Sequence, residues 1–277
     1  MGSTTYIAEC LRKVYALLKV ATLRRDKLPC SPGDHPELDS IPLLSDTQHR
    51  LYQHLVGMAE GAVQIGKFDI CYALTPLNRF STAPQEVDLT RLVKVFGYLK
   101  SVLGKRKGTV VSPEDIEEIS GKVANTKYWL EKYPVATGDI DDGQPEPRGR
   151  PLRTTVYFDS DHAHDQVTHR SVYGVLSFVG LTPISWTSKR QGTTESSSYS
   201  IEFCAGRVAS EKAIALRYML RSLGVPIKGD TALCGDNLGM IIYCTNLDLE
   251  LKKKHVAISY HKLRECAAAG IVNPTRV

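Results

Sequence analysis

The sequence predicts an α/β fold in which a mixed sheet with flanking helices follows a mainly helical segment. Two observations carry this prediction. Over residues 156–265 the apolar patterns follow the order strand, strand, strand, helix, strand, helix, helix. Residues 1–104 instead place their apolar side chains mainly at helical spacing. We therefore expect a helical segment over 1–104, a linker over 105–150 and a sheet-bearing domain over 151–277.

The composition is ordinary for a globular protein that can bury a sizeable core. Hydrophobic residues make up 42% and charged residues 23% of the 277 residues. The net charge is +5, and residues 151–277 hold 15 Lys and Arg against 11 Asp and Glu. This excess of positive charge suits a polyanionic partner such as a nucleic acid.

Two further features bear on location. No run of apolar residues approaches the roughly 18 that a membrane span needs, so we expect no membrane partner. The seven cysteines include no Cys-x-x-Cys pair, in a chain too long to need a disulfide scaffold. They are typical of reduced thiols in an intracellular protein.

In the first segment, apolar stripes at helical spacing predict helices over 6–23, 46–66 and about 86–103. The short apolar run from Phe68 to Leu74 is expected to break at Thr75-Pro76. The stretch that follows, 105–150, is rich in charge and ends in prolines and glycines, which is typical of a linker. Its acidic cluster Asp139–Asp142 lacks the spacing of a calcium-binding EF-hand, so a solvated linker is the favoured interpretation.

In the second segment, alternating and apolar runs predict strands near 153–159, 172–180 and 183–188. Ser197 or Ser198 is expected to cap a long helix that runs to about residue 222. The remaining expected elements are a short strand ending at Asp236, a helix through Met240–Ile242, a last helix from Lys252 to about 268, and a final strand from Ile271.

Three acids occupy distinctive places in this pattern. Asp159 closes the apolar run Val156–Phe158, Glu202 lies early in the long helix, and Asp236 follows a short strand. Taken singly, each would be a surface or capping acid. Taken together, the element order brings them to one end of the mixed sheet, where converging carboxylates bind hard divalent cations.

At this point the residues resemble one family. Motifs of the second half, in order, are similar to the ribonuclease H domain that ends the Pol polyprotein of copia-type LTR retrotransposons: Phe158-Asp159-Ser160-Asp161-His162-Ala163, Arg170–Gly174, Pro183–Trp186, Ser188–Gln191, Ile201-Glu202-Phe203, Gly235-Asp236-Asn237 and Lys254-His255 to Tyr260-His261. The first half resembles the segment that joins this family's reverse transcriptase to its ribonuclease H: Tyr52–Met58, Phe68–Ala73, Leu77–Phe80, Pro84 and Gly97–Lys100.

The resemblance implies a five-stranded ribonuclease H-like fold, preceded by a reverse transcriptase tail or connection. It also implies an endonuclease, a hydrolase that cuts the RNA strand of RNA–DNA hybrids by two-metal catalysis. In that family the acid matching Asp159 bridges both ions, and the acids matching Glu202 and Asp236 bind mainly one of them. Mg²⁺ suits an all-carboxylate site, with Mn²⁺ as the alternative ion. The implied partners are a hybrid and a reverse transcriptase polymerase region or subunit, in a cytoplasmic retroelement particle or the nucleus.

Basic side chains are the candidates for contacts to the phosphates of the hybrid. They are Lys189, Arg190, Lys252, Lys253, Lys254 and His255. The lysine run at 252–254 has a second interpretation, as a solvated start of a helix. Lysines at the positive end of a helix are unfavourable, however, which leaves an external anion as an equal alternative.

Two departures from the family limit what the resemblance implies. The polymerase signature Tyr-x-Asp-Asp is absent from the sequence, so we expect no polymerase activity. The family also has a fourth carboxylate on a helix after the final strand, and this chain stops at Asn273–Val277, so we expect a ribonuclease H domain truncated at its C-terminal end. The alternative to an active nuclease is therefore an inactive nucleic-acid-binding or structural remnant of the polyprotein.

Overall fold

A computed structural model describes most of the chain, namely residues 3–103, 129, 131–136, 138, 143–192, 194, 197–246, 248, 249, 251 and 256–277. The chain divides into two compact units. Unit 1 comprises Met1–Thr109, Asp165–His169 and Ser188–Arg190. Unit 2 comprises Val110–His164, Arg170–Thr187 and Gln191–Val277. None of the helices in the described part of the chain is both long and apolar enough to span a membrane.

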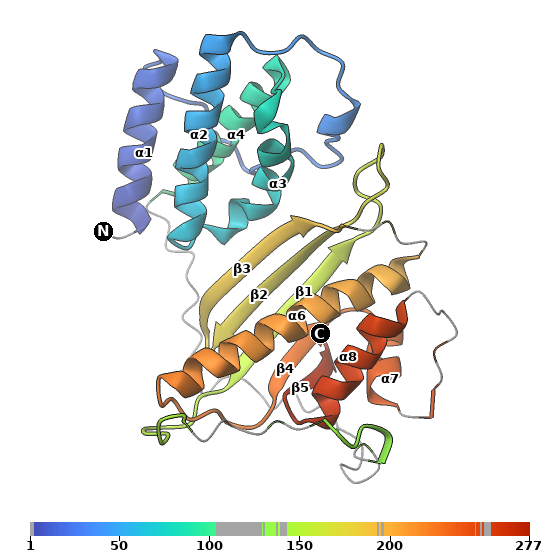
Figure 1. Cartoon of the computed structure of the whole chain (residues 1–277). Helices are drawn as coiled ribbons and strands as arrows, with labels where there is room; N and C mark the ends of the chain where they lie inside the picture. The colour runs from blue at the N-terminus through green and yellow to red at the C-terminus, as the bar shows by residue number, and fades with distance from the viewer. Residues whose placement is uncertain are drawn as a thin grey trace. The chain divides into compact units, whose positions relative to one another are not determined.

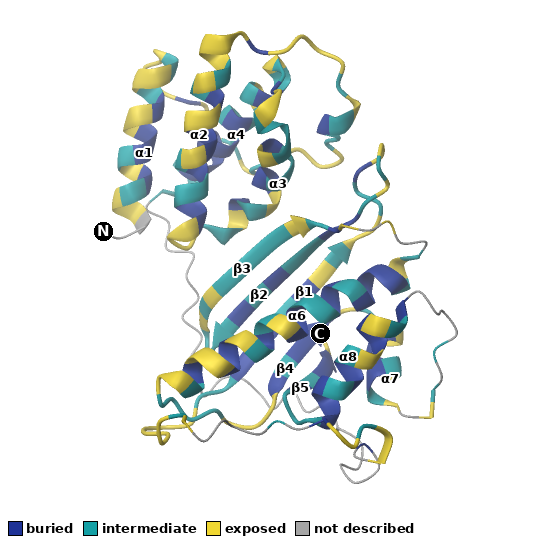
Figure 2. Cartoon of the chain, in the orientation of Figure 1, coloured by how far each residue is buried: buried dark blue, intermediate teal, exposed yellow. Residues whose placement is uncertain are grey.

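Unit 1 is built from helices, as its apolar stripes predict. Its α-helices are α1 (Ser3–Leu18), α2 (Asp46–Gln64), α3 (Cys71–Arg79) and α4 (Glu86–Val102), with short 3-10 turns at Pro36–Leu38, Phe68–Ile70 and Phe80–Thr82. The buried side chains of α2 and α4 follow the expected stripes, seen as dark bands in Figure 2. In α1, Ile7, Leu11 and Val14 are buried as expected, but Leu17 is 40% exposed and the helix ends at Leu18, short of the expected residue 23. The α1 and α2 helices approach closely at Gly61, where an added Cβ would collide with the Tyr6 hydroxyl.

The expected break at Thr75-Pro76 is wrong, because Pro76 lies inside α3. A proline inside a helix removes one backbone donor and usually kinks or ends the helix. Here Ala73, Leu74 and Leu77 are buried on one face of α3. The Thr75 hydroxyl also donates to the carbonyl of Cys71, 3.1 Å away, within the same turns. Burial of this face therefore outweighs the local preference against helix.

Unit 2 holds a mixed five-stranded sheet in the order β3-β2-β1-β4-β5. Its strands are β1 (Thr154–Asp161), β2 (Val172–Val179), β3 (Thr182–Arg190), β4 (Thr231–Gly235) and β5 (Val272–Arg276). The last three residues of β3, Ser188–Arg190, are counted with unit 1. β1 pairs antiparallel with β2 and parallel with β4, and β4 pairs parallel with β5. All five agree with the expected strands. This order and these directions are those of the ribonuclease H-like fold, which confirms the predicted fold class.

Three helices accompany the sheet: α6 (Ser198–Ser222), α7 (Leu238–Thr245) and α8 (Ala257–Ala268). Figure 1 shows α6 lying across one face of the sheet. The core between them includes Val156, Phe158, Phe203 and Leu233. Ser197 is the N-cap of α6, as expected, since its side chain accepts from the backbone N–H of Ser200.

The last helix was expected to open at Lys252–His255, but the helix described begins at Ala257. Residues 252–255 lie outside the described residues. The expected linker 105–150 also falls largely outside them, including its acidic cluster Asp139–Asp142. Within that segment, however, Trp129 and Ala136 are buried against Ala268 at the end of α8. This part of the segment therefore contributes to the core of unit 2.

Candidate metal centre

The structure brings the three sequence-predicted acids together in unit 2. Asp159 lies on β1, Glu202 in the first turns of α6, and Asp236 directly after β4. One ligand oxygen from each lies within 4.8 Å of the others. The register explains this meeting, because Tyr157 pairs with Cys234 in parallel strands. Two residues further along each strand, Asp159 and Asp236 reach the same edge of the sheet.

Glu202 is the buried member of the group, only 5% exposed. Its Oε1 accepts a hydrogen bond from the Ser160 hydroxyl at 2.6 Å. Its Oε2 is buried with no hydrogen-bond partner among the described residues. Burial raises the pKa of Glu202 to about 7, opposed by the Ser160 hydrogen bond and assisted by the charges of Asp159 and Asp236. Glu202 Oε2 is thus a buried carboxylate oxygen without a donor or cation among the described residues.

The other two acids are exposed, so the group is open to solvent on their side. The backbone N–H of Ser160 donates to Asp159 Oδ1 at 2.8 Å. Next to Asp236, the Asn237 side chain accepts from the backbone N–H of Met240 at 3.0 Å and caps α7. Each acid is therefore anchored on, or directly beside, a regular element.

These residues fit a divalent cation. All three side chains offer carboxylate oxygens, which hard cations such as Mg²⁺ prefer. A cation would also supply the missing partner of Glu202 Oε2 and offset the repulsion among three clustered negative charges. Within the described ranges, no other group of three or more His, Cys, Asp or Glu side chains comes close enough together to hold an ion.

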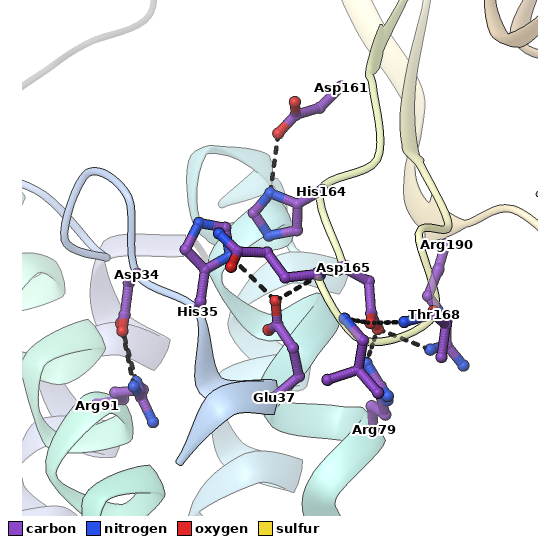
Figure 3. Close-up of polar contacts among 12 residues, drawn as sticks. Asp34, His35, Glu37, Arg79, Arg91, Asp161, His164, Asp165, Thr168 and Arg190 are labelled. Atoms are coloured by element: carbon purple, nitrogen blue, oxygen red, sulfur yellow. Dashed lines mark hydrogen bonds and ion pairs between the residues drawn. The ribbon is translucent and has the colours of Figure 1, made fainter. Parts of the chain in front are cut away.

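The sequence-predicted nucleic-acid contacts are placed only in part. Lys189 is exposed on β3. Arg190 is half-buried and donates to Asp165 Oδ2 at 3.0 Å. Arg79 donates to the same oxygen, and the backbone N–H of Thr168 to Asp165 Oδ1, as Figure 3 shows. All of these residues are in unit 1.

This contact means that Arg190 already has a carboxylate partner within unit 1, so its charge is partly neutralised. The Asp165 carboxylate is buried, which alone would raise its pKa. The Thr168 and Arg190 hydrogen bonds and the Arg79 charge outweigh this and lower the pKa to about 2. The other four candidates, Lys252, Lys253, Lys254 and His255, lie outside the described residues.

Ser160 is the residue of the site that sequence reasoning missed. It touches two of the three acids, through its hydroxyl and its backbone N–H. The alternation along the strand gives only the face of Ser160, because Val156, Phe158 and Ser160 share one face of β1 and the first two are core residues. It does not identify Glu202 as the partner of the hydroxyl.

No protein-family model matches the chain, and the relatives found among known proteins include two Pol polyproteins. The chain is 26% identical over all 277 residues to the retrovirus-related Pol polyprotein from transposon RE1 of Arabidopsis thaliana. It is 29% identical over 140 residues to the corresponding polyprotein from transposon RE2 of the same plant. It spans only 16% of the first polyprotein, and the match covers 10% of the second.

The solved structures that match part of the chain include two more remote ones. One is ribonuclease H1 from Halobacterium salinarum NRC-1, 16% identical, covering 45% of this chain and 85% of the other, with a TM-score of 0.35. The other is the N-terminal ribonuclease H domain of rv2228c from Mycobacterium tuberculosis, 12% identical, covering 46% and 82%, with a TM-score of 0.36. At TM-scores this low, the fold assignment rests on the order and directions of the strands.

The sheet order and the acid group define a protein whose second half has the ribonuclease H fold. Over its whole length, the chain is a distant homologue of copia-type retrotransposon Pol polyproteins. The family resemblance drawn from its motifs is therefore confirmed.

Proposed function

We propose that this chain carries a metal-dependent endonuclease that hydrolyses the RNA strand of RNA–DNA hybrids. The observation that supports it best is the meeting of Asp159, Glu202 and Asp236, from three separate elements, with oxygens within 4.8 Å. Buried Glu202, with one oxygen short of a partner, distinguishes this group from a chance cluster of surface acids. The distant homology to retrotransposon Pol polyproteins supports the same reaction.

All three acids take part in this proposal. Asp159, exposed on β1, would hold the divalent ions together with buried Glu202 and exposed Asp236. When bound, such ions activate a water molecule and stabilise the charge on the leaving oxygen. Ser160 keeps Glu202 directed toward the group through its 2.6 Å hydrogen bond. Mg²⁺ is the ion that we expect, with Mn²⁺ as a substitute.

The proposed substrate is recognised by shape and charge. A hybrid would be read through its phosphates and 2′-hydroxyls rather than its bases. Exposed Lys189 is the described side chain best suited to a phosphate contact, with Arg190 and Lys252–His255 as further candidates. The origin in a Pol polyprotein makes a reverse transcriptase polymerase region or subunit the expected protein partner. It also favours an intracellular site of action, in a retroelement particle or the nucleus.

The test is cleavage of an RNA–DNA hybrid with a label on the RNA strand, in Mg²⁺, in Mn²⁺ and in chelator. We expect cleavage only with a divalent ion, and a loss of at least 100-fold in Asp159→Asn, because the variant loses a charged metal ligand. Asp161→Asn is the matched control. Asp161 is an exposed acid two residues along β1 that pairs with His164 at 2.9 Å and stands outside the group of three.

Three outcomes would separate the alternatives. Cleavage that persists in Asp159→Asn would contradict the assignment of the site. A folded chain that binds the hybrid in a salt-dependent manner without cleaving it would favour an inactive binding module. A folded chain that neither binds nor cleaves would favour a structural remnant of the polyprotein.

A further inference from the structure

We infer that Ser160 is a positioning residue that fixes the direction of the Glu202 carboxylate, so that Glu202 Oε2 is presented to a divalent cation. The inference rests on the proposed function and names a residue outside the three acids. It makes the cation affinity of the site depend on one serine hydroxyl.

The hydrogen bonds support this role. Ser160 Oγ donates to Glu202 Oε1 at 2.6 Å, which is short for a bond between oxygens and typical of an acceptor that carries charge. The second oxygen, Oε2, is buried and has no hydrogen-bond partner in the described part of the chain. One oxygen is thus held by a donor, while the other has no donor among the described residues.

The location of Ser160 on the fold makes the contact rigid. Ser160 is the seventh residue of β1, on the same face as the core side chains Val156 and Phe158. That face is covered by α6, which carries Glu202 in its first turns. The serine backbone is held by strand pairing with Tyr173. The hydroxyl therefore joins a central strand to the helix at the level of the site.

A second contact from the same residue strengthens the argument. The backbone N–H of Ser160 donates to Asp159 Oδ1 at 2.8 Å. Ser160 therefore touches two of the three acids, one through its main chain and one through its side chain. Only the side-chain contact is removed by a substitution, so the effect on Glu202 can be measured while the backbone contact is retained.

Without the hydroxyl, Glu202 would lose its side-chain donor, and among the described residues only the Ser160 backbone N–H would still favour its charged form. The Glu202 side chain would then be held less firmly in the direction of the cation. Residues that orient a metal ligand typically contribute about 10–100-fold to metal affinity or activity. We expect Ser160 to fall in this range, although it need not touch the ion itself.

The experiment is calorimetric titration of the full chain with Mg²⁺ and with Mn²⁺. We compare wild type with Ser160→Ala, Ser160→Thr and Ser160→Val, and use Asp159→Asn as a variant with a damaged site. We expect Ser160→Ala to weaken Mg²⁺ binding by about 10-fold or more. Ser160→Thr keeps the hydroxyl and should stay within about threefold of wild type. Ser160→Val has the shape of the threonine variant but no hydroxyl, and should bind as weakly as Ser160→Ala.

Thermal unfolding in chelator, run beside the titration, separates positioning from stability. If Ser160→Ala does not fold, the threonine and valine variants decide the question as a matched pair. Equal Mg²⁺ affinity in hydroxyl and non-hydroxyl variants would overturn the inference while leaving the metal site intact. Wild-type protein that binds neither ion, like Asp159→Asn, would overturn the proposed function and the inference together.

Discussion

At the scale of single residues, the site depends on one buried carboxylate. Glu202 is buried on α6 beside Ser160 of β1, and one carboxylate oxygen of each of the other two acids lies within 4.8 Å. Burial and these neighbours raise its pKa to about 7, so ionisation of Glu202 opposes folding. Burying ionised Glu202 therefore lowers the free energy of unfolding, and a bound cation would offset this loss.

This cost predicts a dependence of stability on pH in the absence of metal. The folded pKa of about 7 lies above the ordinary value of 4.5. Between these two values the folded state binds more protons than the unfolded state, so stability falls as pH rises from about 4.5 to about 7. Glu202→Gln removes this dependence. In chelator at pH 8, we expect it to be more stable than wild type, by on the order of 2–3 kcal/mol.

Urea unfolding at pH 5 and pH 8 measures this difference. Glu211→Gln is the control, because Glu211 is an exposed acid on the same helix. Added Mg²⁺ at pH 8 should stabilise wild type and leave Glu202→Gln almost unchanged. The same difference in unfolding free energy between wild type and Glu202→Gln at pH 5 and pH 8 would contradict the proposal that ionisation of Glu202 opposes folding.

At this scale the sequence predicts part of the site. Asp159, Glu202 and Asp236 are identifiable because each stands at a set position relative to an apolar run. The burial of Glu202 and its hydrogen bond to Ser160 cannot be predicted from the sequence, because both depend on how α6 packs against β1. Neither residue differs by itself from an ordinary helix acid or strand serine. Similarly, the sequence shows Arg190 only as a basic residue that could contact phosphate, and its ion pair with Asp165 is found only in the structure.

At the scale of elements, the end of β4 packs closely against the Phe158 ring of β1 at Gly235. A Cβ added at Gly235 would lie 2.6 Å from Phe158 Cζ and 3.0 Å from Phe158 Cε2. Phe158 is itself buried in the core, between Tyr157 and Asp159 along β1. The absence of a side chain at Gly235 thus allows β4 to pack closely on this ring, directly before Asp236.

We expect Gly235→Ala to displace the Phe158 ring and to destabilise unit 2 by about 1–3 kcal/mol, the usual range for an overpacked core. Thermal or urea unfolding measures the loss. The control is Gly174→Ala on β2, where an added Cβ meets no atom within 4 Å. If the two alanine variants lose the same stability, the loss comes from replacing a glycine in a strand and does not come from the contact with Phe158.

Strands and helices are easier to predict from the sequence than the positions where a helix continues through a proline. The five strands of the sheet agree with the sequence patterns because each pattern matches a buried face. The helix through Pro76 was missed because the local rule against proline takes no account of the apolar face that α3 buries. Local preference is a weak guide wherever tertiary burial opposes it.

At the scale of the whole molecule, a distant segment completes unit 2. Trp129 is 1% exposed and contacts Ala268 and Tyr133. The Arg264 guanidinium lies over the Trp129 ring at 5.6 Å, and its Nη2 donates to the carbonyl of Asn246. Because the surrounding sequence is highly charged, it was expected to be a linker. A single buried tryptophan gives no periodic signal, so its partners are found only in the fold.

We expect Trp129→Ala to destabilise unit 2 by about 3–5 kcal/mol, as for other fully buried aromatic residues. The size of the effect reflects both the cavity and the exposed charge of Arg264. Val135→Ala is the control from the same segment, since Val135 is 82% exposed. Thermal unfolding followed by near-ultraviolet circular dichroism reports on both. A Trp129→Ala variant as stable as Val135→Ala would show that this segment adds nothing to unit 2.

The strand order has a consequence for the kinetics of chain folding. β1, β2 and β3 are consecutive in sequence and adjacent in the sheet, so they close through short loops. β4 pairs with the other side of β1 and is separated from it in the sequence by β2, β3 and α6. Pairings between distant segments carry the larger entropic barrier and form slowly. We therefore expect Asp159 to take its place before Asp236, which joins the group of acids only when β4 pairs with β1.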